Sequence, residues 1–146
     1  MDYRHNLIED ESGIRRLLRG VNRVAVLGIK TEAQSGQAAF YVPEYLVSVG
    51  VEVIPVPVYY PEVTEILGRK VFRKVAEIPG KVDLVDVFRR PKDIDAHVDD
   101  IVSKAPGAVW FQLGIRNDAA AEKLARAGIQ VVQDRCLMVD YRRYVA

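Results

Sequence analysis

The stretch RVAVLG at residues 23–28 is followed by the loop IKTEAQSGQ at residues 29–37 and by AAFYVPEYLVSV at residues 38–49. The first run is short and almost wholly apolar, and it lacks the alternation of polar and apolar residues that marks a half-exposed strand. A strand of this kind is covered on both faces, as in a parallel sheet between two helix layers. The stretch therefore predicts a strand, a loop and a helix of a doubly wound α/β domain.

The rest of the chain repeats this order of apolar run and helical segment. Runs rich in Val and Ile predict further strands at residues 51–56, 82–88, 108–113 and 129–133, with a short sixth strand at 70–72. Apolar residues at helical spacing predict further helices at residues 11–19, 91–104, 117–127 and 138–143. We expect one three-layer, Rossmann-like α/β domain over residues 1–146, with a mostly parallel sheet of five or six strands.

Composition excludes several classes of function. The 146 residues carry 21 Lys and Arg against 20 Asp and Glu, and this net charge of +1 gives no broad basic field for nucleic acid. No run approaches the roughly 20 apolar residues that cross a bilayer, and the first residues carry charges where a signal peptide is apolar. The one cysteine, Cys136, cannot form an internal disulfide and suits a reducing compartment. We expect a cytoplasmic protein that binds neither nucleic acid nor membrane, with His5 and His97 on its surface.

The loop after the first predicted strand is a candidate ligand site. It places Gly28, Lys30, Ser35 and Gly36 ahead of a helix N-terminus, where outward N–H groups and the helix dipole attract phosphate. The loop matches neither G-x-G-x-x-G nor a P-loop. A phosphate cradle and an ordinary surface loop therefore both stay open.

The end of the second predicted strand narrows the choice of ligand. It reads VIPVPVYY at residues 53–60, with no acid before Glu62. Strands that bind NAD end close to an acid that bonds the ribose hydroxyls. A ribose that carries a phosphate would bind better beside a cation than beside an acid. Both coenzyme A (CoA) and NADP carry such a ribose.

Cations and polar groups follow the next two predicted strands. The stretch VDVFRRP at residues 85–91 places Arg89 and Arg90 directly before a helix start, where guanidinium groups can grip phosphates. Two solvated arginines are the alternative. Gln112 lies at the end of the fourth predicted strand and Gly114 directly after it, so polar or cationic residues from several strand ends should face one crevice.

Three further features in or near the predicted strands bear on the site or on the core. Cys136 follows the last strand, where its thiol could meet the thiol end of a pantetheine arm or pack as a small buried side chain. Asp86 lies inside a strand that should be buried, and because an unpaired internal carboxylate is costly, we expect it to pair with Arg135 or Arg89. The aromatic residues 110–111 are expected in the core.

Stretches from about residue 20 to residue 143 match a known family in sequence and spacing: AVLGIK, FYVPEYLVSVG, VEVIPV, ILGRKVF, VAEIP, VDLVDVFRRP, AVWFQLGIRN and AGIQVVQDRCLMVDYRR. In them the chain resembles the bacterial and archaeal CoA-binding proteins related to the CoA-binding domain of the succinyl-CoA synthetase α chain. The resemblance implies a Rossmann-like fold with CoA across the strand ends and its diphosphate near the first loop. The contacts it implies come from Gly28, Ile29, Lys30, Pro57, Phe88, Arg89, Gln112 and Gly114.

The resemblance has two limits. Many relatives carry Asn-Pro and an Arg in the first loop, whereas this chain reads KTEAQSGQ at residues 30–37. The match also does not include the second domain of the synthetase, with its phosphorylated histidine. Ligase activity of that kind is therefore not expected.

These observations favour non-catalytic binding of CoA or acyl-CoA as the function, because no acid–base constellation recurs at the strand ends. The alternative is an enzyme, either one that uses CoA thiol chemistry at Cys136 or an NADP-dependent oxidoreductase. A regulatory interaction protein is a third reading. A homodimer or a partner enzyme stays open as the assembly.

Overall fold

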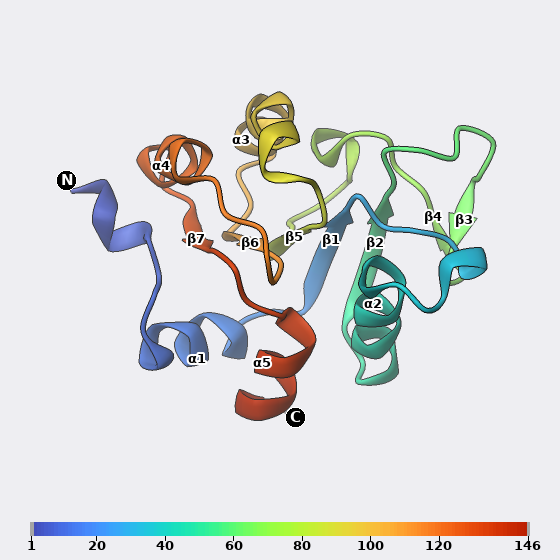
Figure 1. Cartoon of the computed structure of the whole chain (residues 1–146), viewed down its shortest axis with the longest axis horizontal. Coiled ribbons are helices and arrows are strands. Elements are labelled where there is room, and N and C mark those ends of the chain that lie inside the picture. Colours follow the sequence, from blue (N-terminus) through green and yellow to red (C-terminus); the bar gives the residue numbers. More distant parts are fainter. Residues whose placement is uncertain (1, 146) are drawn as a thin grey trace.

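The computed structural model describes residues 2–145 and has a five-stranded parallel sheet at its centre (Figure 1). The strands are β1 (Arg23–Leu27), β2 (Glu52–Val56), β5 (Leu84–Val87), β6 (Ala108–Phe111) and β7 (Gln130–Val132). Their order is β2-β1-β5-β6-β7, and each neighbouring pair is parallel. The predicted α/β, Rossmann-like class is confirmed.

Helices cover both faces of this sheet, as Figure 1 shows. One face packs against α1 (Glu11–Arg19), α2 (Ala38–Ser48) and α5 (Leu137–Tyr144), and the other against α3 (Val98–Lys104) and α4 (Asp118–Arg126). Successive strand residues point to opposite faces, so each strand contributes to two separate apolar layers. Within residues 2–145, no helix is long and apolar enough to cross a bilayer.

The aromatic residues 110–111 are fully buried in β6, as predicted. Phe111 packs on the α3 and α4 side, and Trp110 on the α2 and α5 side. The indole Nε1 of Trp110 donates a hydrogen bond to the carbonyl oxygen of Arg135 at 2.7 Å. This bond satisfies the only polar group of the ring and attaches the loop between β7 and α5 to β6.

The predicted helix at residues 91–104 is shorter than expected. Only α3 is α-helical, and two 3-10 turns precede it, η4 (Pro91–Asp93) and η5 (Asp95–His97). The carbonyl oxygen of Pro91 accepts the N–H of Ile94 at 3.3 Å and the side-chain amide of Asn117 at 2.8 Å. The first turn therefore closes with an i→i+3 bond, and the α-helix starts later.

The predicted sixth strand at residues 70–72 is confirmed only in part, because the short strand present there starts one residue earlier and does not join the main sheet. The structure has a small antiparallel hairpin there, β3 (Glu65–Ile66) and β4 (Arg69–Lys70), which forms a separate sheet. Leu67 and Gly68 at its turn both have positive φ, 54° and 71°, which suits a tight two-residue connection. Such a short hairpin leaves too few residues for a visible alternating pattern.

Single backbone hydrogen bonds connect other segments to the two edges of the main sheet. At one edge, the N–H of Phe72 donates to the carbonyl oxygen of Pro55 in β2 at 3.0 Å. Pro55 has no N–H to offer, which suits an edge strand. At the other edge, the N–H of Ile8 donates to the carbonyl oxygen of Val131 in β7 at 2.9 Å.

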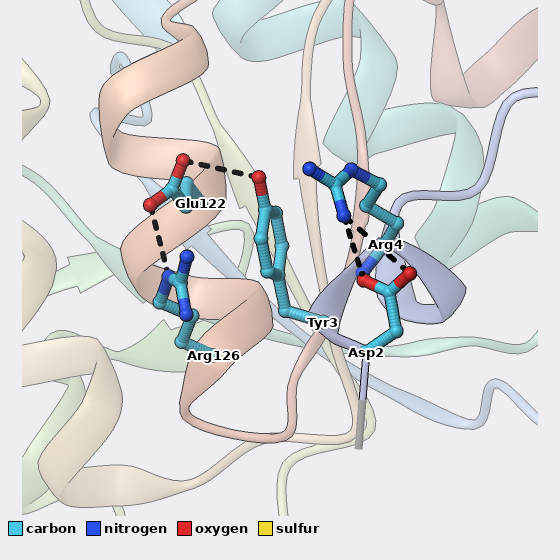
Figure 2. Close-up of polar contacts among 5 residues, drawn as sticks. All are labelled: Asp2, Tyr3, Arg4, Glu122 and Arg126. Carbon is cyan, nitrogen blue, oxygen red and sulfur yellow. Dashed lines mark hydrogen bonds and ion pairs between the residues drawn. The ribbon is translucent and has the colours of Figure 1, made fainter.

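The N-terminal segment before Ile8 lies on α4 through the turn η1 (Tyr3–Asn6), as Figure 2 shows. The hydroxyl of Tyr3 donates to Glu122 at 3.2 Å, and Glu122 also accepts from Nε of Arg126 at 2.9 Å. The Arg126 guanidinium lies 4.2 Å from the centre of the Tyr3 ring. These contacts attach the start of the chain to the outer helix layer.

The expected pairing of Asp86 with Arg135 or Arg89 is wrong. Asp86 is fully buried in β5, and neither carboxyl oxygen has a hydrogen-bond partner among the described residues. Arg135 instead binds Asp140, at 2.6 and 3.0 Å. Alternation along the chain places Asp86 on the α2 and α5 side of the sheet, whereas Arg89 extends toward the α3 side. Burial raises the pKa of Asp86 well above its ordinary value, which favours the neutral, protonated form of the side chain.

Candidate functional site

The site follows from the connections at the middle of the sheet. β1 leads to α2 on one face, whereas its neighbour β5 leads to α3 on the other face. The loops after β1 and β5 therefore lead to opposite faces of the sheet (Figure 1). This is the position at which open parallel sheets bind ligands.

A cavity of about 240 Å³, the β1–β5 crevice, lies at this position. Its lining comes from three strand-end loops, those after β1, β2 and β5: Gly28, Ile29, Lys30, Tyr59, Tyr60, Phe88, Arg89 and Arg90. Six of these eight residues are among the site residues that we predict from the sequence. The fold thus brings the first loop and the FRRP segment together around one space.

Gly28 allows the two strand-end loops to approach closely. Its φ is +86°, and a β-carbon at this position would lie 2.3 Å from the carbonyl oxygen of Phe88. The N–H of Gly28 donates to the carbonyl oxygen of Val56 at 2.9 Å, which continues the β1–β2 pairing. A side chain at residue 28 would force the loops apart, so glycine is required by both space and backbone conformation.

The two arginines of the cavity have different surroundings. The side chain of Arg89 is 14% exposed, whereas that of Arg90 is 68% exposed and binds Asp93 at 2.8 Å. Arg89 lies 3.9 Å from the same carboxylate. Its Nε donates to Nε2 of His97 at 3.2 Å, and its Nη1 donates to the hydroxyl of Tyr59 at 3.4 Å. Arg89 is therefore the better positioned of the two for a ligand.

Charge around Arg89 shifts the protonation of its neighbours. Its hydrogen bond and its charge hold the pKa of the Tyr59 hydroxyl below the ordinary value. Burial, and then the Arg89 charge, lowers the pKa of His97. The hydrogen bond from Arg90 lowers the pKa of Asp93, which keeps that carboxylate ionised. These shifts favour a neutral imidazole at His97 and an ionised carboxylate at Asp93 beside the guanidinium.

The exposed ring of Tyr59 adds a second kind of surface to the cavity. The residue is 58% exposed, and the Arg89 guanidinium lies 5.6 Å from the centre of its ring. Tyr60, which also lines the cavity, stands edge-on to this ring, with 6.4 Å between the ring centres. An aromatic face beside cations can bind a base and a phosphate of one ligand together.

Sequence reasoning missed the two tyrosines and His97. The tyrosines are the third and fourth residues after β2, and this place in a strand-end loop was the signal that could have identified them. The expectation that His97 lies plainly on the surface is wrong, because the residue is half-buried and accepts a bond from Arg89. No sequence signal indicates this contact, since it depends on the 3-10 turn at η5.

The other predicted site residues lie outside the cavity lining. Ser35 and Gly36 are exposed between the turn η2 (Glu32–Gln34) and α2, and Pro57 is buried at the end of β2. Gln112 is buried, and its Oε1 accepts the first N–H of α5 at 3.0 Å, a role in helix capping. The exposed Gly114 donates its N–H to Asp134 at 2.6 Å, which connects the loops after β6 and β7.

Cys136 lies farther along the same rim of the sheet. It is half-buried and directly precedes α5. A second hollow of about 270 Å³ adjoins it, and the exposed side chains of Leu113 and Val139 line this hollow. The strand ends thus carry a cationic cavity at β1 and β5 and an apolar hollow at β6 and β7.

Comparison with known proteins gives the family. A family model described as a CoA binding domain matches residues 22–142. This chain belongs to the CoA binding domain family. The match extends over all five strands of the main sheet, and the resemblance seen in the sequence is confirmed.

Several relatives of this CoA binding domain have nearly the same length. A protein of known structure from Thermus thermophilus is 35% identical, with a TM-score of 0.84 over 93% of this chain and 99% of that chain. A hypothetical protein from Pyrococcus horikoshii OT3 is 31% identical, with a TM-score of 0.83 over 94% of each chain. The uncharacterized protein YneT of Bacillus subtilis is 29% identical over 88% of this chain and 91% of its own length.

A more distant structure shares the fold alone. It is a dinucleotide-forming acetyl-coenzyme A synthetase from Ca. Korarchaeum cryptofilum, 20% identical, with a TM-score of 0.63. The alignment covers 75% of this chain and 25% of the synthetase. The CoA binding domain described here therefore corresponds in fold to one part of a larger enzyme.

Proposed function

We propose that this protein binds CoA without catalysing a reaction, and that the nucleotide end of CoA occupies the cavity at the β1–β5 crevice. The observation that carries this proposal is the joint presence of Gly28, Tyr59 and Arg89 around one space of about 240 Å³. Family membership favours CoA among nucleotide ligands.

The cavity suits a phosphorylated adenosine. Arg89, Arg90 and Lys30 supply positive charge, and guanidinium groups bind phosphate in bidentate geometry. The exposed ring of Tyr59 offers a stacking face for adenine. The end of β2 offers phenols rather than the carboxylate that would bond free ribose hydroxyls, so a phosphorylated ribose fits better.

The rest of the ligand has a path along the rim. From β1 to β7 the sheet spans three strand spacings, about 14 Å. A pantetheine arm that leaves the cavity in this direction passes the loop with Gln112 and Gly114 and reaches the hollow at Cys136. The apolar side chains of Leu113 and Val139 there are compatible with a thiol or an acyl thioester.

The lining favours binding over catalysis. Among its eight residues, all within the described part of the chain, none carries a carboxylate, an imidazole or a thiol. Proton transfer commonly uses such groups within hydrogen-bond distance of the ligand. His97 touches Arg89 from behind and is not part of the lining.

Titration calorimetry tests the proposal with CoA, dephospho-CoA and NADP on protein freed of ligand. We expect CoA to bind and dephospho-CoA to bind more weakly, because the second lacks the 3′-phosphate. R89Q should weaken CoA binding about 10- to 100-fold, the effect of losing a hydrogen bond to a charged group. R19Q, at the exposed end of α1, is the matched control and should leave binding unchanged.

Either of two results would refute this function. The absence of heat with CoA would show that the family's fold is present without its ligand. Tighter binding of NADP than of CoA would move the oxidoreductase alternative to the front.

Thiol exchange at Cys136 is a second candidate function, favoured by the hollow beside this residue. Its thiolate would attack one sulfur of CoA disulfide, form a protein–CoA disulfide and release one CoA thiol. Mass spectrometry after exposure to CoA disulfide should then show one CoA adduct on the wild type and none on C136S. An unmodified wild type that still binds CoA would exclude this chemistry.

A further inference from the structure

We infer that His97 is a positioning residue, which holds the Arg89 guanidinium toward the cavity only while its own imidazole is neutral. The inference rests on the proposed function, because Arg89 is the cation assigned to the phosphates of CoA. It adds a residue outside the cavity that determines ligand affinity and makes this affinity depend on pH. His97 and Arg89 are connected by the hydrogen bond of 3.2 Å between Nε2 and Nε.

The direction of this hydrogen bond fixes the state of the imidazole. Arginine has five N–H donors and no acceptor, so Nε2 of His97 must accept. The imidazole proton then resides on Nδ1. Protonation of Nε2 would place two donors and two positive charges at this contact, and the guanidinium would have to move away.

Several charged groups face this pair. Arg89 itself raises the cost of charging His97, whereas Asp93 and Asp100 favour the charged form. Asp100 has other partners, since its carboxylate accepts the backbone N–H groups of Val75 and Ala76 at 2.8 and 2.9 Å. Burial is the largest cause of the lowered pKa of His97, and it also disfavours the charged form.

The contact leaves the outer part of Arg89 free for a ligand. His97 binds Nε, and the hydroxyl of Tyr59 accepts from Nη1 at the long distance of 3.4 Å. Asp93 is 3.9 Å away from Nη2 and is bound more closely by Arg90. With one edge of the guanidinium held by His97, the N–H groups on Nη1 and Nη2 remain for bidentate contact with a phosphate.

The first test compares CoA affinity at pH 7.5 and pH 5.0 by calorimetry for the wild type, H97A, H97Q and H5A. At pH 7.5 we expect H97A to weaken binding about tenfold, and H97Q, whose amide oxygen can accept from Nε, to retain wild-type affinity within about threefold. At pH 5.0 the wild type should lose more affinity than H97Q. The protonation of free CoA is the same in every titration at a given pH. A larger loss of affinity in the wild type than in H97Q is therefore caused by His97.

H5A is the matched control, since the chain has two histidines and His5 is exposed in the N-terminal segment. It should match the wild type at both pH values. A wild type that gains affinity relative to H97Q at pH 5.0 would overturn the inference, because His97 would then bind phosphate directly as a cation. Equal affinities of H97A and wild type at pH 7.5 would also overturn it.

The second test needs no ligand. Proton NMR should give the His97 imidazole a pKa below the ordinary histidine value, and R89Q should raise that pKa. An unchanged His97 titration in R89Q would refute the contact itself. If the contact is present and CoA fails to bind the wild type, the proposed function is the part that fails, and with it the role of His97 toward CoA.

Discussion

Replacement of Asp86 should make the protein more stable, and increasingly so as pH rises. Asp86 is fully buried with both carboxyl oxygens unpartnered among the described residues, and a buried polar group in this state costs about 1–3 kcal/mol. D86L removes that cost. The folded-state pKa is raised, so the stability linked to this proton is present below the unfolded Asp pKa and is lost as pH rises toward the folded value.

The size of the pH effect follows from the proton count. While the folded state keeps the proton and the unfolded state has lost it, the wild-type free energy of unfolding falls by about 1.4 kcal/mol per pH unit from this residue. D86L and D86N cannot ionise at this position, so the difference in free energy of unfolding between each variant and the wild type should widen by up to that amount per unit as pH rises from the unfolded Asp pKa toward the raised folded pKa. Urea unfolding at pH 5, 6 and 7, followed by circular dichroism, measures this gap.

D86N keeps the volume of the side chain, which separates the effect of ionisation from any strain that leucine introduces. The control is D83N, because the Asp83 carboxylate accepts the N–H groups of Asn22 and Arg23 at 2.9 and 2.8 Å and its change should reduce stability. A gap between D86N and wild type that stays constant from pH 5 to pH 7 would refute the reasoning. Asp86 would then have the same charge in the folded and in the unfolded protein over this pH range.

Three further substitutions test single contacts. G28A should lower Tm and weaken CoA binding, because the added β-carbon would meet the carbonyl oxygen of Phe88. The positive φ alone costs about 1–3 kcal/mol when the residue is not glycine. An unchanged Tm would mean that the loops after β1 and β5 can separate freely. W110F should lower the free energy of urea unfolding by about 1–2 kcal/mol through loss of the indole bond to the Arg135 carbonyl, and a neutral result would argue against that bond. Q112L should cost about 1 kcal/mol by uncapping α5, and slower amide hydrogen exchange in α5 would contradict this role.

The sequence predicts the main sheet because its strands are short apolar runs rich in Val and Ile, unlike the segments that flank them. RVAVLG at residues 23–28 and the apolar runs at 51–56 and 108–113 are strands in the structure within one or two residues. The hairpin of β3 and β4 escapes this reasoning, because two residues per strand show no period. Its turn, with Leu67 at positive φ, is visible only in three dimensions.

The site is predictable to the extent that it follows from strand ends. Gly28 directly follows β1, and Arg89 is the second residue after β5. Because β1 and β5 are neighbours in the sheet, the meeting of these two residues follows from topology. The partners of individual side chains do not follow. Asp86 and Arg89 are three residues apart and lie on opposite faces of the sheet, and His97 reaches Arg89 only because 3-10 turns replace the expected first turn of the helix.

The single backbone bonds at the two sheet edges also restrict how copies of this protein could assemble. An unprotected edge strand can template the addition of a strand from another molecule, which is a common route to aggregates. Here the chain segment at Phe72 lies along the β2 edge, and the segment at Ile8 lies along the β7 edge. Growth of a continuous intermolecular sheet would first have to displace one of these segments. Self-association without such displacement would have to use helix or loop surfaces.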